Sequence, residues 1–338
     1  MALPDLSIVP DEHRSTVDTA LTDAFGSSGA SALRAVTGGA SGALTYRVEA
    51  ADRPYLLRVE TMRGPMRNPH QYDCMQIAAD AEIAPPIRHL DADAGVVVLP
   101  FLPLRPLADF VGGPPALATA AADLLARLHE TTPFAVHGDH LDNLDRMLRF
   151  RERSGRVAPG LLDVHVTAFE RIRAAYLWRP DTFVSAHNDP NAFNLLYDGE
   201  RLWLIDWETA TRSDPFIDIA TLASHLGTTP ELRELVLRAA IRREPSPVDR
   251  ARLTLMSRIV QLYAGSILLL IVVDPATPTH TDLTAMAVDQ FRAAVASGEL
   301  APSTTATAHA YAKLVLNQFI EAIATPDFDE ALHTAAPA

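Results

Sequence analysis

Two residue types are nearly absent from this chain of 338 residues, and each absence excludes something. Cys74 is the only cysteine, which rules out an internal disulfide and any multi-cysteine metal site. It lies in a helical pattern, and we predict that it is a small buried apolar residue. Lys313 is the only lysine, so arginine must take any role in which an enzyme normally uses lysine.

Long hydrophobic runs and an excess of positive charge are also missing. The longest apolar run, 267–273, falls short of the ~20 residues that cross a bilayer, so we expect no membrane span. Residues 1–10 have neither the basic region nor the long apolar region of a secretory signal, which favours a cytoplasmic protein. The net charge of −13 argues against nucleic-acid binding and is compatible with cationic ligands.

The first hundred residues alternate like short strands. Val, Leu, Tyr and Thr are frequent in these segments, and Gly-Gly or Asp-Arg-Pro separates them, which predicts an antiparallel arrangement. The predicted strands are 33–37, 43–50, 54–60, 87–90 and 96–101. Helical spacing predicts one helix, 69–81, with Asn68 as its N-cap. Residues 1–16 are a candidate for disorder.

Pro100, Pro103 and Pro106 break the last strand pattern, so we place a hinge near residue 102, between lobes at 1–102 and 103–338. The second lobe is mostly helical, and the fold class is therefore α+β. Its predicted helices are 116–129, 141–153, 161–178, 216–226, 230–243, 247–273, 281–296 and 304–324. The exception is a hairpin of 193–196 with 202–205, joined by Asp198-Gly199.

The most informative stretch surrounds this hairpin. It reads His187-Asn188-Asp189-Pro190-Asn191-Ala192-Phe193-Asn194, followed by Leu204-Ile205-Asp206-Trp207-Glu208. Phosphoryl transfer needs a carboxylate to receive the proton of an attacking hydroxyl. It also needs an amide and a second carboxylate to hold Mg²⁺ on the phosphates. Each residue type is common in turns, so the interpretation depends on the whole motif and on the hairpin that brings Asn194 near Asp206.

These motifs resemble those of the aminoglycoside phosphotransferase and choline/ethanolamine kinase superfamily, and the resemblance covers roughly residues 33–324. It implies a bilobal protein-kinase-like fold and ATP or GTP as co-substrate. By this resemblance Asp189 receives the acceptor proton, and Asn194 and Asp206 bind Mg²⁺. His187 would orient the loop by hydrogen-bonding its backbone. Asp218, in Asp214-Pro215-x2-Asp218, would anchor the loop from below.

The resemblance also predicts the residues that bind the nucleotide. Gly38, Gly39 and Ser41 would let backbone N–H groups approach the phosphates, although a plain hairpin turn needs no ligand. Arg58 occupies the strand position of the phosphate-binding cation; the alternative is a solvent-exposed arginine at a strand edge.

The acid that should pair with Arg58 is less clear. The family's glutamate falls near Gln71, whose amide cannot neutralise an arginine, and Asp73 lies close by. Either Asp73 takes the role or the ion pair is absent. At the hinge, Leu99 to Leu102 would read the base edge through backbone groups. Because proline has no N–H, Phe101 and Leu102 are the candidate donors.

Two other patterns allow a ligand but favour ordinary structure. His137-Gly138-Asp139-His140 with Asp142 suggests a metal cluster, yet Asp and His before a helix are commonly caps. Trp178, Trp203 and Trp207 suggest an aromatic cage for a quaternary ammonium, whereas strand aromatics usually pack in the core.

The hypothesis is a small-molecule kinase that moves the γ-phosphate of a nucleoside triphosphate to a hydroxylated acceptor. Residues 274–338 carry eight acidic and two basic side chains, which favours a cationic acceptor such as an aminoglycoside or an amino alcohol. The rival hypothesis is a catalytically silent kinase-like module that binds nucleotide and regulates a partner, suggested by Gln71.

Overall fold

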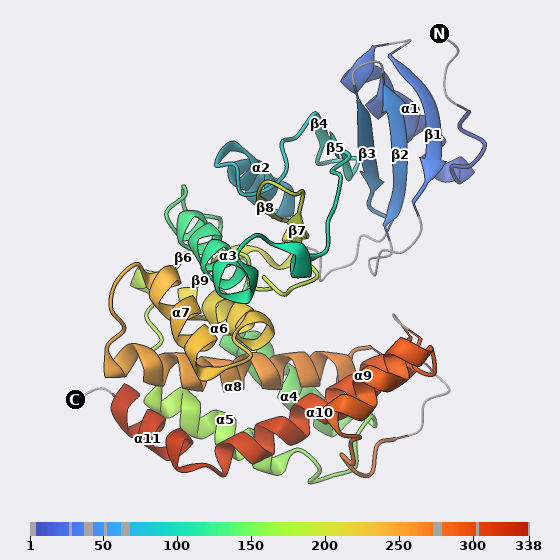
Figure 1. The fold of residues 1–338 in the computed structure, drawn as a ribbon. Coiled ribbons are helices and arrows are strands. Elements are labelled where there is room, and N and C mark those ends of the chain that lie inside the picture. The colour runs from blue at the N-terminus through green and yellow to red at the C-terminus, as the bar shows by residue number, and fades with distance from the viewer. Residues whose placement is uncertain are drawn as a thin grey trace.

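A computed structural model describes residues 5–26, 29–36, 43–50, 53–61, 68–272, 279–301 and 304–336. A β-sheet stands at one end of the molecule and a set of helices at the other, with α2, β7 and β8 between them (Figure 1). The prediction of an α+β fold with a β-rich lobe and a helical lobe is confirmed.

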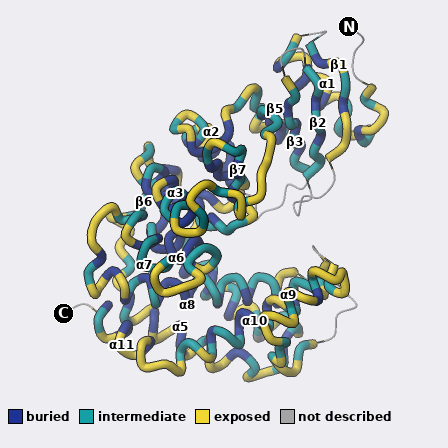
Figure 2. Tube along the Cα trace, viewed as in Figure 1, coloured by how far each residue is buried: buried dark blue, intermediate teal, exposed yellow. Residues whose placement is uncertain are grey.

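The sheet is antiparallel and has the strand order β1-β2-β3-β5-β4. Along β3 the residues Tyr55, Leu57 and Val59 are buried on one face, while Leu56 and Arg58 point to the other, as the period of two requires. The strands are β1 (Ala30–Ala35), β2 (Leu44–Ala50), β3 (Pro54–Val59), β4 (His89–Asp91) and β5 (Val96–Pro100). Buried residues run along β2 and β3 in Figure 2, and burial alternates along both strands.

Helix α1 (Asp11–Phe25) covers the first of these faces, where Val17 and Leu21 join a core with Tyr55 and Leu57. The suggestion that residues 1–16 are disordered is wrong from Asp11 onward. Acidic residues in the first turn favour a helix start there, because they complement the helix dipole. No helix is predicted here from the sequence, because α1 is short and mostly polar.

Helix α2 (Gln71–Asp80) is where the sequence predicts a helix, but Asn68 is not its N-cap. Asn68 is buried, and its side-chain amide instead donates to the Ala210 carbonyl at 2.6 Å. Cys74 is buried as predicted, and burial raises the pKa of its thiol to about 12. The buried residues of α2 belong to the large core that continues into the helical lobe.

In the helical lobe, α8 runs through the centre and packs against α4, α6, α10 and α11. Its length and apolar composition are sufficient for a membrane span, but 56% of its most apolar window is buried inside the protein. The helices are α3 (Gly113–His129), α4 (His140–Ser154), α5 (Asp163–Ala175), α6 (Pro215–Leu226), α7 (Pro230–Ile241), α8 (Pro247–Leu270), α9 (Val288–Ser297), α10 (Thr305–Ile323) and α11 (Pro326–Ala335).

Several predicted helix ends are wrong. The helix predicted at 161–178 spans Asp163–Ala175, and the one predicted at 281–296 begins only at Val288. The Asp282 carboxylate accepts the Thr284 N–H at 2.8 Å, a local turn that competes with the helix. Helix α11 and the strand pair of β6 (Val184–Ala186) and β9 (Thr211–Ser213) were not predicted from the sequence.

The predicted hairpin is confirmed as β7 (Leu195–Tyr197) and β8 (Leu202–Leu204), with Leu195 opposite Leu204. Gly199 has φ of 101°, and a Cβ there would lie 2.8 Å from Arg105 Nε, so the turn needs glycine. Three 3-10 turns, η1 (Leu107–Asp109), η2 (Pro180–Thr182) and η3 (Trp207–Thr209), complete the described elements.

Candidate active site

Asp189 and Asn194 lie in one loop between β6 and β7 and contact each other directly. Asn194 Nδ2 donates to the Asp189 carbonyl at 2.9 Å and to its carboxylate oxygen Oδ2 at 3.3 Å. Asn191 Nδ2 donates to the other carboxylate oxygen at 2.8 Å. The carboxylate of Asp189 is therefore held in place from both sides by amides of its own loop.

Asp218 of α6 anchors this loop from the protein interior. Its fully buried carboxylate accepts the backbone N–H groups of His187 at 3.0 Å and Asn188 at 2.6 Å. It also contacts His129 Nε2 at 2.9 Å, so α3 contributes to the anchor. Asn188 has φ of 63°, a left-handed conformation that needs such support.

His187 is buried, and its ring lies 4.7 Å from that of Trp207. Its Nε2 is 2.9 Å from the Ile205 carbonyl oxygen, which joins the loop to the segment that carries Asp206. This is the arrangement expected of an orienting residue. Its catalytic role stays a prediction.

The pKa of Asp189 is raised, chiefly because burial disfavours the charged carboxylate. The hydrogen bond from Asn191 and the nearby His187 act in the opposite direction, while the charges of Asp206 and Asp218 raise the pKa further. A buried carboxylate with a raised pKa is suited to receive a proton.

Asp206 follows β8 and is brought beside Asn194 by the hairpin, because the Ile205 N–H donates to the Asn194 carbonyl at 3.0 Å. It has φ of 70°, unusual for a residue with a side chain, and lines the cleft between the lobes. Asn194 Nδ2 is occupied by Asp189, so Oδ1 is the atom available to a ligand. One amide oxygen and one carboxylate are hard oxygen donors, and this donor set fits Mg²⁺.

The cleft has a volume of about 290 Å³ and lies between the sheet and the hairpin. Arg58, Gln71 and Asp206 contribute charged or polar groups to a largely apolar lining. The apolar residues include Val36, Leu56, Val97, Leu99, Phe101, Leu102, Leu196 and Ile205. A largely apolar cleft that also contains a cationic and an anionic side chain is suited to a nucleotide.

Arg58 is not a strand-edge residue, because β3 lies between β2 and β5 and only 22% of its side chain is exposed. Among the described residues its ion-pair partner is Glu208 of η3, at 2.6 Å between Nη2 and Oε1. Neither predicted candidate takes this role. Gln71 Nε2 donates to Glu60 at 3.2 Å, and Asp73 is largely exposed and lies 3.7 Å from His70.

At the hinge one of the two candidate donors is already engaged. The Phe101 N–H donates to the Pro54 carbonyl at 3.0 Å and so extends the pairing of β3 with β5. Leu102 is left with an N–H that has no hydrogen-bond partner in the described part of the chain. Gly38, Gly39 and Ser41 lie outside the described residues.

The patterns set aside in the sequence have ordinary structural roles. The Asp139 carboxylate caps α4 by accepting the Asp142 N–H at 3.0 Å, and the described residues contain no cluster of three His, Cys, Asp or Glu suited to a metal. Trp203 and Trp207 are buried in the core. Trp178 donates to Asp139 at 2.7 Å.

With this geometry in place, the chain can be compared with known proteins. A sequence profile described as the phosphotransferase enzyme family matches residues 32–254, well over half of the chain. The chain belongs to the phosphotransferase enzyme family. The superfamily suggested by the motifs is thereby confirmed, and none of the curated proteins matches the sequence significantly.

Several solved structures share the fold of this chain at low sequence identity. A choline/ethanolamine kinase family protein from Mesorhizobium loti has a TM-score of 0.67 and 19% identity, covering 95% of this chain and 98% of that one. A choline kinase from Streptococcus pneumoniae has a TM-score of 0.59 and 12% identity, covering 91% of this chain and 100% of that one. Spectinomycin phosphotransferase, solved with ADP and spectinomycin, has a TM-score of 0.55 and 12% identity, covering 89% of this chain and 98% of that one.

Sequence reasoning missed Glu208, Asn191 and His129. Glu208 is the last residue of the motif that contains Asp206, but the sequence suggests no role for it, because its partner Arg58 is 150 residues away in the chain. Asn191 sits two residues after Asp189, and this short spacing signals a side-chain bond within a turn. His129 at the end of α3 had no sequence signal that linked it to Asp218.

Proposed function

We propose that the chain transfers the γ-phosphate of ATP or GTP to a hydroxyl group of a small molecule. The observation that carries this proposal is the contact between Asp189 and Asn194 in one anchored loop, with Asp206 brought alongside by the hairpin. Of these residues, Asp206 lines the cleft that also contains Arg58, and the hydrogen bond from Ile205 to Asn194 ties the loop of Asp189 to that lining.

In this mechanism each residue has one task. Asp189 receives the proton from the acceptor hydroxyl as that oxygen attacks the γ-phosphorus, with the bond to the leaving nucleoside diphosphate breaking in the same displacement. Asn191 and Asn194 keep its carboxylate in position, and Asp218 keeps the loop backbone in position. Arg58 binds phosphate oxygens through its guanidinium fork.

Asn194 Oδ1 and the Asp206 carboxylate are the groups that would hold Mg²⁺. When bound, Mg²⁺ would neutralise charge on the phosphate oxygens. The Leu102 N–H would bind an edge of the base, while Leu56, Val97 and Leu99 would pack against its ring. Backbone donors alone do not separate adenine from guanine.

We further propose that the acceptor is cationic. Tyr263 of α8 and Tyr311 of α10 have pKa values raised by burial and also by the negative charge of Asp189, so both phenol rings lie within the field of that carboxylate. A carboxylate whose field reaches two aromatic rings favours a cationic ligand. Among the similar structures, choline kinases and a spectinomycin phosphotransferase are named for amine-containing compounds.

The experiment is a turnover assay across a panel of acceptors. ADP or GDP release from Mg²⁺-nucleotide is measured with aminoglycosides, choline, ethanolamine, neutral sugars and nucleosides, for wild type and Asp189→Ala. We expect release that depends on one class of acceptor and is lost in the variant. Release with neutral sugars alone would overturn the cationic assignment but not the kinase assignment.

The rival, a silent nucleotide-binding module, rests on Gln71 at the position of the expected glutamate. The same panel tests it, combined with thermal stabilisation by Mg²⁺-nucleotide. Stabilisation without turnover on any acceptor would support the silent module. Turnover lost in Asp189→Ala would exclude it.

A further inference from the structure

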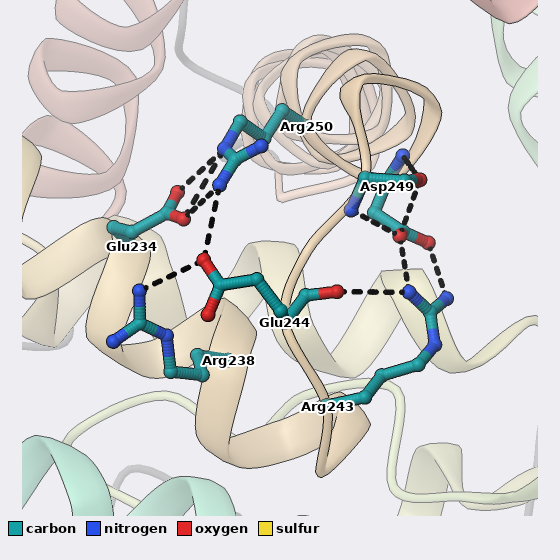
Figure 3. Close-up of polar contacts among 7 residues, drawn as sticks. Glu234, Arg238, Arg243, Glu244, Asp249 and Arg250 are labelled. Atoms are coloured by element: carbon teal, nitrogen blue, oxygen red, sulfur yellow. Dashed lines mark hydrogen bonds and ion pairs between the residues drawn. The ribbon is translucent and has the colours of Figure 1, made fainter.

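The helices α7 and α8 and the segment between them carry many arginines, and most of these are matched by acids. Figure 3 shows Arg238, Arg243 and Arg250 each facing a carboxylate. Arg250 lies 2.5 Å from Glu234, and Arg243 lies 2.6 Å from Asp249. Such pairing is expected in a chain with 42 acidic and 29 basic residues.

Arg233 and Arg258 on the same two helices are the exception. In the described part of the chain neither forms an ion pair. Arg233 Nη2 donates to neutral oxygens, Ser257 Oγ at 2.7 Å and the Leu253 carbonyl at 3.3 Å. Arg258 Nε is buried and has no hydrogen-bond partner, and the same is true of Gln261 Oε1 one turn further along α8.

Arg233 reaches the part of α8 that carries Arg258, because its Nη2 bonds Ser257, the residue before Arg258. The pKa of Arg258 is lowered to about 10, first because of burial and then because of the positive charge of Arg233. Burial also lowers the pKa of Arg233, and no carboxylate contributes to either value. An uncompensated, partly buried cation destabilises the fold, and two side by side do so more.

Both arginines are only partly buried, so a solute can reach them. A guanidinium fork binds phosphate and carboxylate oxygens with two parallel hydrogen bonds. We propose that Arg233 and Arg258 form a binding site for a small oxyanion, a phosphate or carboxylate group, separate from the nucleotide cleft. The ligand would supply the negative charge that the chain itself does not place there.

The test measures the melting temperature of the full chain against inorganic phosphate, glycerol phosphate and acetate, each compared with chloride at equal ionic strength. The first two ligands distinguish free phosphate from a phosphomonoester, and acetate represents carboxylates. At ten times its dissociation constant, a ligand at one site should raise the melting temperature by about 2 °C.

Two variants isolate the site. Arg258→Met should lose this increase and should melt higher than wild type without any anion, because it removes the unpaired charge. Arg250→Met, on the same helix but paired with Glu234, should keep the increase. Arg58→Met should also keep it, which separates this site from phosphate binding in the nucleotide cleft.

The proposal is overturned if no anion raises the melting temperature of wild type. It is equally overturned if the increase survives in Arg258→Met. A third contrary result is a melting temperature that no anion changes, together with strong destabilisation of the protein by Gln261→Met. That combination would mean that Arg258 and Gln261 bond each other in solution. None of these outcomes depends on kinase activity.

Discussion

Arg58 of β3 and Glu208 of η3 form an ion pair of 2.6 Å that joins the sheet to the segment following Asp206. In the sequence the only candidates for this role were Gln71 and Asp73. Arg58 is therefore held by an acid two residues after Asp206, and α2 does not supply that acid.

We predict that Glu208→Ala raises the KM for nucleotide about 3- to 10-fold, because Arg58 loses the charge-assisted hydrogen bond that fixes its position. Half of the Glu208 side chain is exposed, which limits the effect. Steady-state kinetics with varied nucleotide provide the measurement. Asp73→Ala is the control, since 77% of that side chain is exposed. An equal rise in both variants, or a lower KM in Glu208→Ala, would contradict the assignment.

Asp218→Asn should lower kcat about 100-fold while nucleotide binding changes little. The carboxylate accepts two backbone N–H groups of the loop and contacts His129, and an amide cannot satisfy all three. A loop that moves by a fraction of an ångström misplaces Asp189. The decisive comparison is between the fall in kcat and the change in the nucleotide dissociation constant. A variant that loses activity and nucleotide affinity to the same extent would indicate simple unfolding.

Arg252→Met should destabilise the protein by about 3 kcal/mol. It leaves Asp214 fully buried without the guanidinium at 2.9 Å that compensates its charge. Burial is the main cause that raises the pKa of Asp214, and Arg252 opposes it. Urea unfolding measures the change. Arg250→Met on the same helix breaks a more exposed pair and should cost less than about 1 kcal/mol.

Asp249 should make part of the stability depend on acid pH. Burial alone would raise its pKa, but hydrogen bonds from Arg243 and Ser246 outweigh it, and the pKa falls from 3.8 to about 2. Because the pKa of Asp249 is lower in the folded state, the stability that its carboxylate contributes is complete above pH ~4. That stability is lost as the pH falls toward 2. Asp249→Asn should cost about 1–2 kcal/mol at pH 7, where the capping box of α8 is also weakened, and less at pH 3. A cost that is the same at both pH values would contradict the assignment.

The sequence was sufficient where structure is determined locally. Asp198-Gly199 predicted the hairpin, because the turn chemistry and the flanking apolar residues agree. The loop from His187 to Asn194 likewise carries its own hydrogen-bonding residues. Contacts between distant segments could not be predicted. Asn68 was read as a helix cap because the local pattern allows it, whereas its amide bonds a carbonyl 142 residues away. The pairing of Arg58 with Glu208 has the same origin.

The central claim is that Asp189 takes the proton of an acceptor hydroxyl as the γ-phosphate is transferred. The most direct measurement is phosphorus NMR of the products formed from Mg²⁺-ATP and the best acceptor of the panel. We predict a new phosphomonoester signal with wild type and none with Asp189→Ala, although that variant still binds nucleotide. A phosphomonoester formed at the wild-type rate by Asp189→Ala, or none formed by wild type from any acceptor, would contradict the account.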